Sequence, residues 1–356
     1  LAQKKGFYKN LLHFRIPLTK EQPSIEIKLP YFPVELKYEK WLHRNFQKEL
    51  AKTILYWKRE YSKDTQIVTP ESLVNNFYKA GLHHIHITTD KDSKTGILYA
   101  KSSPAWYETI WANLAIDTAL ALDYRGHFKE AEKYLEPFLT WQGVNSTPNM
   151  DIKNNHGFLA PPSDYSAISW VSNHGWILWG LAEHYKLTHH EKWLERILPV
   201  ILKGCDWIVR ARKSTKLLSS TGDKLLGYGL LPAGTVSDDE GAGQYFSNEA
   251  HCYRGFKNCV DILLEINHPH AKQLKKEIQE YLHDIQETLH LAVQGSIRVK
   301  LADGEKTPYI PNEIHELQPP VFQRENFWPY INYVDVGPLH LVDAEILDPK
   351  SGIVDW

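Results

Sequence analysis

The strongest constraint on the fold is a helical periodicity that returns in pairs along the chain. Apolar residues recur at helical spacing from Trp41 to Trp57. The segment from Ala105 to Gly143 shows this pattern twice, with Gly126 at the turn between two apolar faces. Residues 170–212 and 248–289 each show it twice as well. Such pairs predict antiparallel helical hairpins in series, with long polar connections between pairs and short ones within them.

The first residues follow a different pattern. The stretch SIEIKLPYFPVEL alternates apolar and polar residues between prolines, which indicates an edge strand or an extended connector. We expect residues 1–36 to be an extended or β segment, either the end of a preceding β-rich domain or a short arm. Residues 37–356 would then form an all-α domain.

A second helix is predicted to begin after Thr69-Pro70-Glu71, where a capping residue precedes a proline, and to run through Tyr78. The phrase HHIHITTD follows, and its alternation predicts a strand with His84 and His86 on one face. A metal site there lacks a nearby carboxylate or thiolate, so structural or exposed histidines are the favoured interpretation.

One connection concentrates acidic residues. Between Gly227 and Phe256 a loop rich in Gly and Pro carries Asp238, Asp239 and Glu240, and Tyr245 follows. We interpret these acids as carboxylates at the mouth of a pocket with aromatic walls. The alternative is an exposed acidic turn.

Composition excludes some classes of partner and favours another. The net charge of -2 over 356 residues gives no electrostatic footprint for nucleic acid or anionic membrane. The chain has 12 Trp, 19 Tyr and 12 Phe, more aromatic surface than a core alone requires. Aromatic rings stack on the apolar C–H faces of sugars, so we expect a carbohydrate partner.

A family resemblance lies in the hairpins and the acidic loop. It is carried by WYETIWANLAIDTALAL, GWILWGLAEHYKLT, GLLPAG with acids after it, and CYRGF. Here the chain resembles the six-hairpin glycosidases, which include glucoamylase-like, trehalase-like and rhamnosidase-like enzymes. The resemblance implies an all-α (α/α)6 toroid that hydrolyses a glycosidic bond of an oligo- or polysaccharide with inversion. One toroid hosts many chemistries, so the fold is implied more specifically than the reaction.

Two departures from the family pattern affect this interpretation. Many relatives read Trp-x-Arg-Asp at the first inner helix, whereas this chain has Trp111-Ala112-Asn113-Leu114, so a charged sugar-binding pair is missing. In addition, only about four hairpins fit before Trp356. We therefore expect the last part of the ring to lie beyond the given chain or to be replaced.

Hydrolysis of a glycosidic bond needs two carboxyl groups across the sugar. One donates a proton to the leaving oxygen, and the other activates water or attacks the anomeric carbon. We expect the acid among Asp238, Asp239 and Glu240, with Glu240 first, because clustered negative charge raises the pKa of one member. Glu249 and Asp335 are candidate partners. For any one of these acids taken singly, a solvated surface residue or a helix cap is the favoured interpretation.

The remaining candidates would hold sugar rings and hydroxyls. They are Trp106, Tyr107, Glu108, Trp111, Asn155, His156, Asp164, Trp170, His174, Trp176, Tyr245, Arg254 and Glu325. Glu325 is also a possible catalytic partner. By contrast, Trp179, Trp193 and Trp207 recur at helical spacing inside hairpins and are expected in the core.

Two other functions remain open. The phrases Asn154-Asn155-His156-Gly157 and Asn173-His174-Gly175, with Tyr245 and Arg254, resemble the residue sets of toroid polysaccharide lyases. In that chemistry an amide neutralises a uronate carboxylate while His or Tyr removes the adjacent proton. The acidic cluster would repel a polyanionic substrate, which favours the hydrolase. A carbohydrate-binding toroid without catalysis is the third possibility.

No cofactor motif is present, neither a phosphate-cradling glycine loop nor HExxH, and we predict no cofactor. Calcium on loop acids stays open. Three cysteines argue against a disulfide framework, and no apolar run reaches membrane-spanning length. Because the chain opens on Leu1 and contains only Met150, we expect an excerpt of a longer protein. The family resemblance implies a secreted or periplasmic location.

Overall fold

The computed structural model describes residues 16–20, 23–25, 27–28, 35–101, 103, 109–144, 155–162, 170–236, 242–300, 304–308, 310–315 and 339–354. The chain divides into two compact units, Leu1–Ser62 and Lys63–Trp356, and each is described by itself. The division therefore lies after Ser62, whereas the sequence pattern placed it after residue 36.

The first unit contains a 3-10 helix, η1 (Leu36–Trp41), and helix α1 (Phe46–Tyr61). The Asn45 side chain caps α1 by accepting a hydrogen bond from the Lys48 amide at 3.0 Å. Neither helix has a buried residue, so the single apolar face predicted for this region is present but exposed. The predicted extended stretch SIEIKLPYFPVEL lies mostly outside the described residues.

Helix α2 (Ser72–Thr88) begins where predicted but is longer, and it contains His84 and His86. The predicted strand is therefore wrong for most of HHIHITTD. Leu82 is buried and Ile85 packs against the core, so it is helical spacing that buries this segment. Only the end of the phrase enters β1 (Thr89–Lys91), which pairs antiparallel with β2 (Leu98–Ala100).

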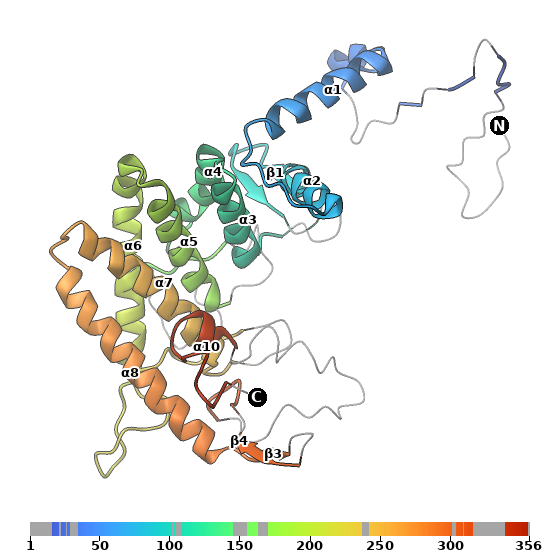
Figure 1. Ribbon diagram of the computed structural model, residues 1–356. Helices are drawn as coiled ribbons and strands as arrows, with labels where there is room; N and C mark the ends of the chain where they lie inside the picture. The colour runs from blue at the N-terminus through green and yellow to red at the C-terminus, as the bar shows by residue number, and fades with distance from the viewer. Residues whose placement is uncertain are drawn as a thin grey trace, which may run out of the picture. The chain divides into compact units, whose positions relative to one another are not determined.

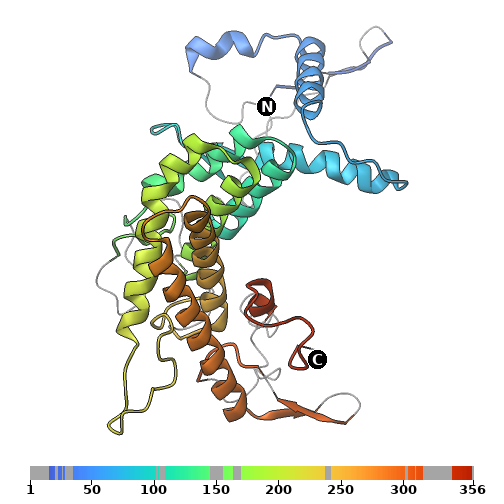
Figure 2. The same ribbon diagram turned by 60° about the vertical axis from the view of Figure 1, so that its left-hand side comes forward.

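Three helical hairpins build the described body of the second unit, and each was predicted. They are α3 (Ala112–Tyr124) with α4 (Phe128–Thr140), α5 (Ser172–Thr188) with α6 (Glu191–Ser214), and α7 (Phe246–Glu265) with α8 (Ala271–Gly295). Helix α5 contacts both α3 and α7, so the first helices of the hairpins form an inner layer, and their partners α4, α6 and α8 form an outer one (Figures 1 and 2). This is the all-α, toroid-type architecture that the sequence predicts.

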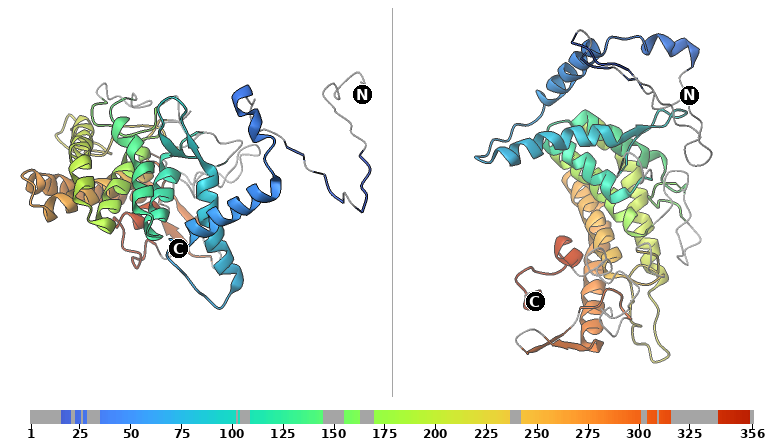
Figure 3. Two further views of the ribbon diagram at one scale, coloured as in Figure 1. Left: turned by 90° about the horizontal axis from the view of Figure 1, so that it is seen from above. Right: turned by 90° about the vertical axis from the view of Figure 1, so that its right-hand side faces the viewer.

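The chain after α8 adds smaller elements. Strands β3 (Arg298–Lys300) and β4 (Lys306–Pro308) form an antiparallel pair, and α10 (Leu339–Asp343) packs on α7. Figure 3 shows the helical layers from two further directions. Within the described part of the chain, none of the helices combines the length and the apolar character that crossing a membrane requires.

Glycines inside the helices let the inner layer pack at backbone contact. A Cβ added at Gly175 of α5 would lie 2.2 Å from the His251 carbonyl carbon of α7, and one added at Gly255 would lie 2.4 Å from the Gly175 oxygen. Gly180 likewise admits the Ile116 side chain of α3 at a distance that a Cβ would not allow. Glycine is less favourable than alanine inside a helix. Here, however, it lets two helices approach more closely than alanine would allow.

The core lies between the two layers. Trp193 and Trp207 are fully buried in it, as the sequence predicts. Trp179 differs, because it is only half-buried and packs beside Trp176. The three cysteines, Cys205, Cys252 and Cys259, are free and buried.

Candidate functional site

Three long connections end at one side of the inner layer. Residues 101–111, 141–171 and 215–245 lead into the N-terminal ends of α3, α5 and α7, whereas the connections within hairpins are short. The prediction of long connections between pairs and short ones within them is therefore confirmed for these hairpins. Side chains and loops at the N-terminal ends of the inner helices are the first place to look for a site.

The acidic connection leaves and re-enters the body through a fixed neck. Gly234 donates to the Gly243 carbonyl at 2.9 Å, and Gly243 donates to the Gly234 carbonyl at 3.1 Å. The residues between them include Asp238, Asp239 and Glu240, which lie outside the described residues. The paired glycines thus close the loop that carries the predicted catalytic acid.

Hydrogen bonds attach this neck to the N-terminal ends of α5 and α7. The Thr235 carbonyl accepts from the Val171 amide at 3.3 Å and from the Asn248 side-chain amide at 3.4 Å. The Asn248 side-chain oxygen in turn accepts from the Ser172 amide at 3.1 Å. Asn248 is buried, so it cross-links the two helices as well as holding the loop.

Aromatic rings and a carboxylate stand beside the neck. The rings of Trp111 and Trp170 pack with centroids 5.0 Å apart, joining the ends of α3 and α5. A Cβ added at Gly243 would lie 2.9 Å from Cγ of Glu313 and 3.0 Å from the Tyr245 ring, so all three residues are adjacent. We call Trp111, Trp170, Gly234, Gly243, Tyr245 and Glu313 the rim.

The Glu313 side chain is held by backbone donors. It accepts from the Gln244 amide at 3.3 Å and from the His315 amide at 2.8 Å. A two-sided bridge also joins the backbones, because Phe246 donates to Asn312 at 2.9 Å and Ile314 donates to Gln244 at 3.1 Å. Residues 310–315 are therefore part of the rim's framework.

About two helical turns from the rim, a second group of side chains lines α3, α5 and α7. The Arg254 guanidinium lies 3.6 Å from the Trp179 ring centroid, and Trp176 packs against Trp179 at 5.4 Å and against His251 at 4.9 Å. Asp117 of α3 interacts electrostatically with Arg254. We call Asp117, Trp176, Trp179, His251 and Arg254 the inner wall.

The charges of the inner wall are partly desolvated. Burial raises the pKa of Asp117, and the Arg254 charge opposes this shift. Desolvation lowers the pKa of Arg254, which Asp343, Glu183 and Asp117 oppose. Burial also holds the pKa of His251 well below its usual value. Cation, carboxyl and indole together are the set that binds sugar hydroxyls and stacks on sugar faces.

The structure places some predicted site residues together and leaves others undescribed. Trp111, Trp170 and Tyr245 lie on the rim, and Trp176 and Arg254 lie on the inner wall. The predicted residues outside the described part of the chain are Trp106, Tyr107, Glu108, Asp164, Asp238, Asp239, Glu240, Glu325 and Asp335.

Glu249 does not reach the surface. Its side chain is on α7 and is 1% exposed, and both carboxyl oxygens accept from the Leu231 amide, at 3.1 and 3.2 Å. Tyr281 also donates to it at 2.6 Å. In this arrangement the carboxyl group cannot touch a sugar, so the predicted catalytic role is replaced by a buried, loop-holding one.

His174 is also a core residue rather than a ligand for substrate. It is fully buried, its Nδ1 accepts from the Leu159 amide at 3.0 Å, and its Nε2 faces the Gly204 carbonyl at 3.1 Å. Burial lowers its pKa to about 3, so it is neutral. Asn155 bonds the Gly143 carbonyl at 2.9 Å, and His156 is exposed beside α6.

Because of this placement, His174 of the phrase Asn173-His174-Gly175 cannot serve as the base of a lyase reaction. Both ring nitrogens of His174 are used inside the core, and Asn173 is buried next to it. The described lyase candidates Asn155 and His156 are not brought to the inner wall where Arg254 lies. Among the described residues the lyase interpretation therefore loses His174 as a base, and otherwise it stays a prediction.

The sequence analysis did not predict Glu313, His251 or Asp117 as site residues. It expected Trp179 in the core, whereas Trp179 is only half-buried. Asp117 lies within the Trp-rich entry WYETIWANLAIDTALAL, and its place there could have indicated it. Glu313 has no such local signal. Its place depends on the pairing of residues 310–315 with the start of α7, two segments far apart in sequence.

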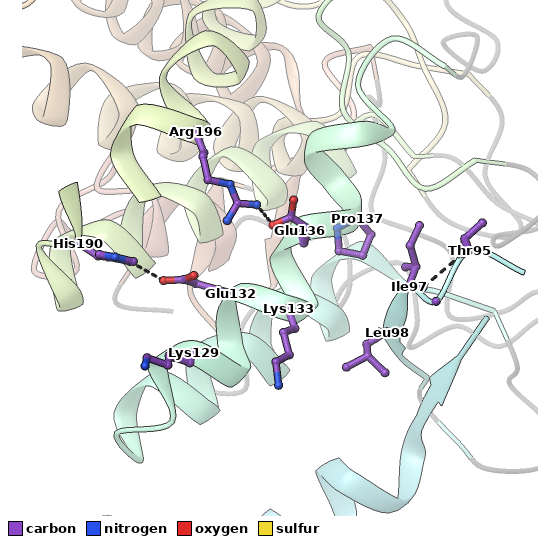
Figure 4. Close-up of a pocket in the computed structure, with 11 residues that line it drawn as sticks. Thr95, Ile97, Leu98, Lys129, Glu132, Lys133, Glu136, Pro137, His190 and Arg196 are labelled. Atoms are coloured by element: carbon purple, nitrogen blue, oxygen red, sulfur yellow. Dashed lines mark hydrogen bonds and ion pairs between the residues drawn. The ribbon is translucent and has the colours of Figure 1, made fainter. Parts of the chain in front are cut away.

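A cavity of about 550 Å³ lies elsewhere, against α4, the start of α6 and the turn between β1 and β2 (Figure 4). Its acids are already paired, Glu132 with His190 at 2.6 Å and Glu136 with Arg196. None of the predicted site residues lines it. It is separate from the rim and the inner wall.

Among the residues that the structure describes, no group of three or more His, Cys, Asp or Glu side chains is arranged to hold a metal ion. The rim and the inner wall combine neutral aromatic rings with the Arg254 guanidinium and with the carboxyl groups of Asp117 and Glu313. Such groups support proton transfer and sugar binding.

No protein-family model matches the chain, and no curated protein matches it at a significant level. Among solved structures the chain is similar to a metal-independent alpha mannosidase of Streptococcus pneumoniae, described in a non-productive complex with alpha-1,6-mannobiose. The sequence identity is 11% and the TM-score 0.44, over 76% of this chain and 67% of that one.

Proposed function

We propose that the chain is a glycoside hydrolase that binds a neutral oligo- or polysaccharide at the rim and the inner wall. The observation that carries the proposal is the neck formed by Gly234 and Gly243. It fixes an acid-bearing loop to the N-terminal ends of α5 and α7, beside the ring pair of Trp111 and Trp170. Acids delivered next to stacking surfaces are what glycosidic bond cleavage requires.

Chain length alone restricts the reach of the acids. Glu240 is three residues from Gly243, so its Cα is at most about 11 Å from that of Gly243. The same arithmetic keeps Asp238, four residues from Gly234, within about 14 Å of the neck. The proposal requires the loop to bring its acids to the rim within this reach.

In the proposed reaction Glu240 is the general acid. It donates its proton to the glycosidic oxygen as the bond from that oxygen to the anomeric carbon breaks. A carboxylate on the opposite side takes a proton from water, whose oxygen bonds to the anomeric carbon. One water is consumed, and the products are a hemiacetal sugar and an alcohol, with inversion of configuration.

We propose Glu313 as the partner carboxylate, because it is the described rim acid closest to the neck and backbone amides fix its orientation. Asp335 and Glu325 are the other candidates. An inverting pair needs roughly 6.5–9.5 Å between its carboxyl groups to admit water. Because backbone amides hold the Glu313 carboxylate in place, it can serve as the stationary member of such a pair.

A neutral substrate is favoured by the charge of the site. The acidic loop and Glu313 are negative, Asp117 adds a carboxyl group to the inner wall, and Arg254 is the one guanidinium among its five residues. A polyanionic chain would be repelled from such a surface. A neutral sugar can instead accept from Arg254, donate to Asp117 and stack on Trp176.

The test compares three carboxamide variants in a reducing-end assay on neutral glycans. Glu240→Gln and Glu313→Gln should each lower kcat by at least about 100-fold, because general acid–base catalysis contributes about that much. Glu195→Gln, an exposed acid on the outer helix α6, should leave the rate unchanged. Full activity in Glu240→Gln would remove the acid assignment.

A further inference from the structure

A buried acid holds the segment that leads into the acidic loop. Glu249 is on α7, and its carboxyl group lies between α8 and residues 227–236. There it accepts hydrogen bonds from the Leu231 amide and the Tyr281 hydroxyl. Leu231 and Tyr281 are themselves buried. A buried amide without a partner is costly, so this carboxyl group determines where the Leu231 backbone can lie.

Other side chains donate hydrogen bonds to backbone carbonyl groups of the same segment. Arg212 Nε donates to the Gly229 carbonyl at 2.7 Å, Thr215 donates to the Leu230 carbonyl at 2.6 Å, and Gln244 donates to the Leu231 carbonyl at 2.7 Å. These anchors come from α6 and from the start of α7. Glu249 is the side chain that bonds the Leu231 amide.

Gly229 shows how closely the segment is seated. Its φ is +73°, and an added Cβ would lie 2.1 Å from a carboxylate oxygen of Asp284, which is bonded to Arg212 at 2.8 Å. Three residues beyond Leu231 the chain reaches Gly234, the first half of the neck. A shift of the Leu231 backbone would therefore be transmitted to Gly234 through only three residues.

We infer that Glu249 is a positioning residue, which with Tyr281 fixes Leu231 and thereby the place where the acidic loop leaves the body. The inference rests on the proposed function, because it assigns the loop's position a catalytic purpose. It also explains why a carboxyl group is kept in a site that no substrate reaches.

The protonation state of the carboxyl group agrees with this role. Burial raises the pKa of Glu249 to about 8, although the bonds from Tyr281 and Leu231 and the charge of Arg212 oppose the shift. The group is mostly neutral at pH 7, so it acts as a hydrogen-bonding partner rather than as a charge. An amide of the same shape should serve nearly as well, since the Tyr281 hydroxyl can donate or accept.

The experiment uses the full chain and two readouts. Glu249→Gln should keep kcat within about 10-fold of the parent, whereas Glu249→Ala, which leaves the Leu231 amide unpaired, should lose about 100-fold or more, as a positional error at the chemistry does. Hydrogen exchange followed by mass spectrometry should show faster exchange over residues 227–236 in Glu249→Ala and little change over α3 and α4.

A matched pair of tyrosine variants separates this contact from general effects of substitution in the core. Tyr281→Phe should raise exchange over residues 227–236. Tyr253→Phe, a buried tyrosine on α7 whose ring packs near Tyr281, should not. A catalytic Glu249 would instead lose activity in the Gln variant with exchange unchanged, which would overturn the inference.

Unchanged exchange over residues 227–236 in Glu249→Ala would also overturn it, whatever the activity. If the parent chain cleaves no glycan, the proposed function fails, and the catalytic purpose assigned here fails with it. The exchange readout still decides whether Glu249 holds the loop. The two failures are therefore distinguished.

Discussion

The backbone contact between α5 and α7 can be tested with a single methyl group. Gly175→Ala adds a Cβ that would lie 2.2 Å from the His251 carbonyl carbon and 2.3 Å from its oxygen. Ordinary carbon contacts are about 3.5–4.0 Å, so the two helices must separate by roughly 1.5 Å. Backbone atoms cannot rotate away as a side chain can.

Two opposing terms set the magnitude. Alanine favours the helix by about 1 kcal/mol over glycine, and overpacking in a dense core costs about 1–3 kcal/mol or more. Because only backbone can yield at Gly175, we expect the second term to exceed its usual range. The net loss should be about 2 kcal/mol or more, which lowers Tm by about 4–8 °C in a domain of this size.

Urea denaturation followed by tryptophan fluorescence measures the loss. Gly352→Ala is the matched control, since nothing lies within 4 Å of the added Cβ. Gly180→Ala should fall between the two, because its Cβ meets Cδ1 and Cγ2 of the Ile116 side chain, both at 2.6 Å, rather than backbone atoms. A Gly175→Ala protein as stable as the parent would refute the close packing of the inner layer.

Three further outcomes are expected. Arg212→Leu removes the guanidinium that bonds the buried Asp284 carboxylate at 2.8 Å and leaves Lys224, at 3.6 Å, as its ion-pair partner. This change should cost about 3 kcal/mol in urea denaturation, whereas Arg210→Leu, on an exposed pair, should cost under about 1 kcal/mol. Glu249 keeps its proton to about pH 8 in the folded chain and loses it near 4.5 when unfolded, so the folded state binds more protons between these values. Stability should therefore fall as pH rises through that window, by at most about 1.4 kcal/mol per unit, and Glu249→Gln should lack this slope while Glu195→Gln keeps it. Burial raises the thiol pKa of Cys205 and Cys252, so a thiol reagent should modify them only at the rate of unfolding, and rapid modification of the native chain would contradict their placement.

Much of the fold could be predicted because helical hairpins are local. The periodicity of residues 105–143, 170–212 and 248–289 contains both the buried faces and the turns between them, and the observed hairpins follow it. The strand predicted for HHIHITTD failed for a related reason. Its alternation of His and Ile fits period two, but Leu82 and Ile85 pack into the core at helical spacing, and burial outweighed the alternation.

The site was less accessible to sequence reasoning, since it depends on contacts between distant segments. Trp111 and Trp170 could each be proposed as a stacking surface from composition and position, but their contact with each other could not. Nothing local indicates that the Glu249 carboxyl group is covered by Leu231, or that Glu313 meets Gly243 through a backbone bridge. Whether an acid is exposed or buried is a tertiary property, and it reversed the expected role of Glu249.

The most direct test of the account is time-resolved proton NMR of neutral and uronate-containing glycans incubated with the chain. We expect new anomeric signals from a hemiacetal in a neutral glycan, appearing first in the configuration opposite to that of the cleaved bond. Olefinic signals of an unsaturated uronate would contradict the account in favour of a lyase. Spectra that stay unchanged over the whole panel would contradict cleavage altogether.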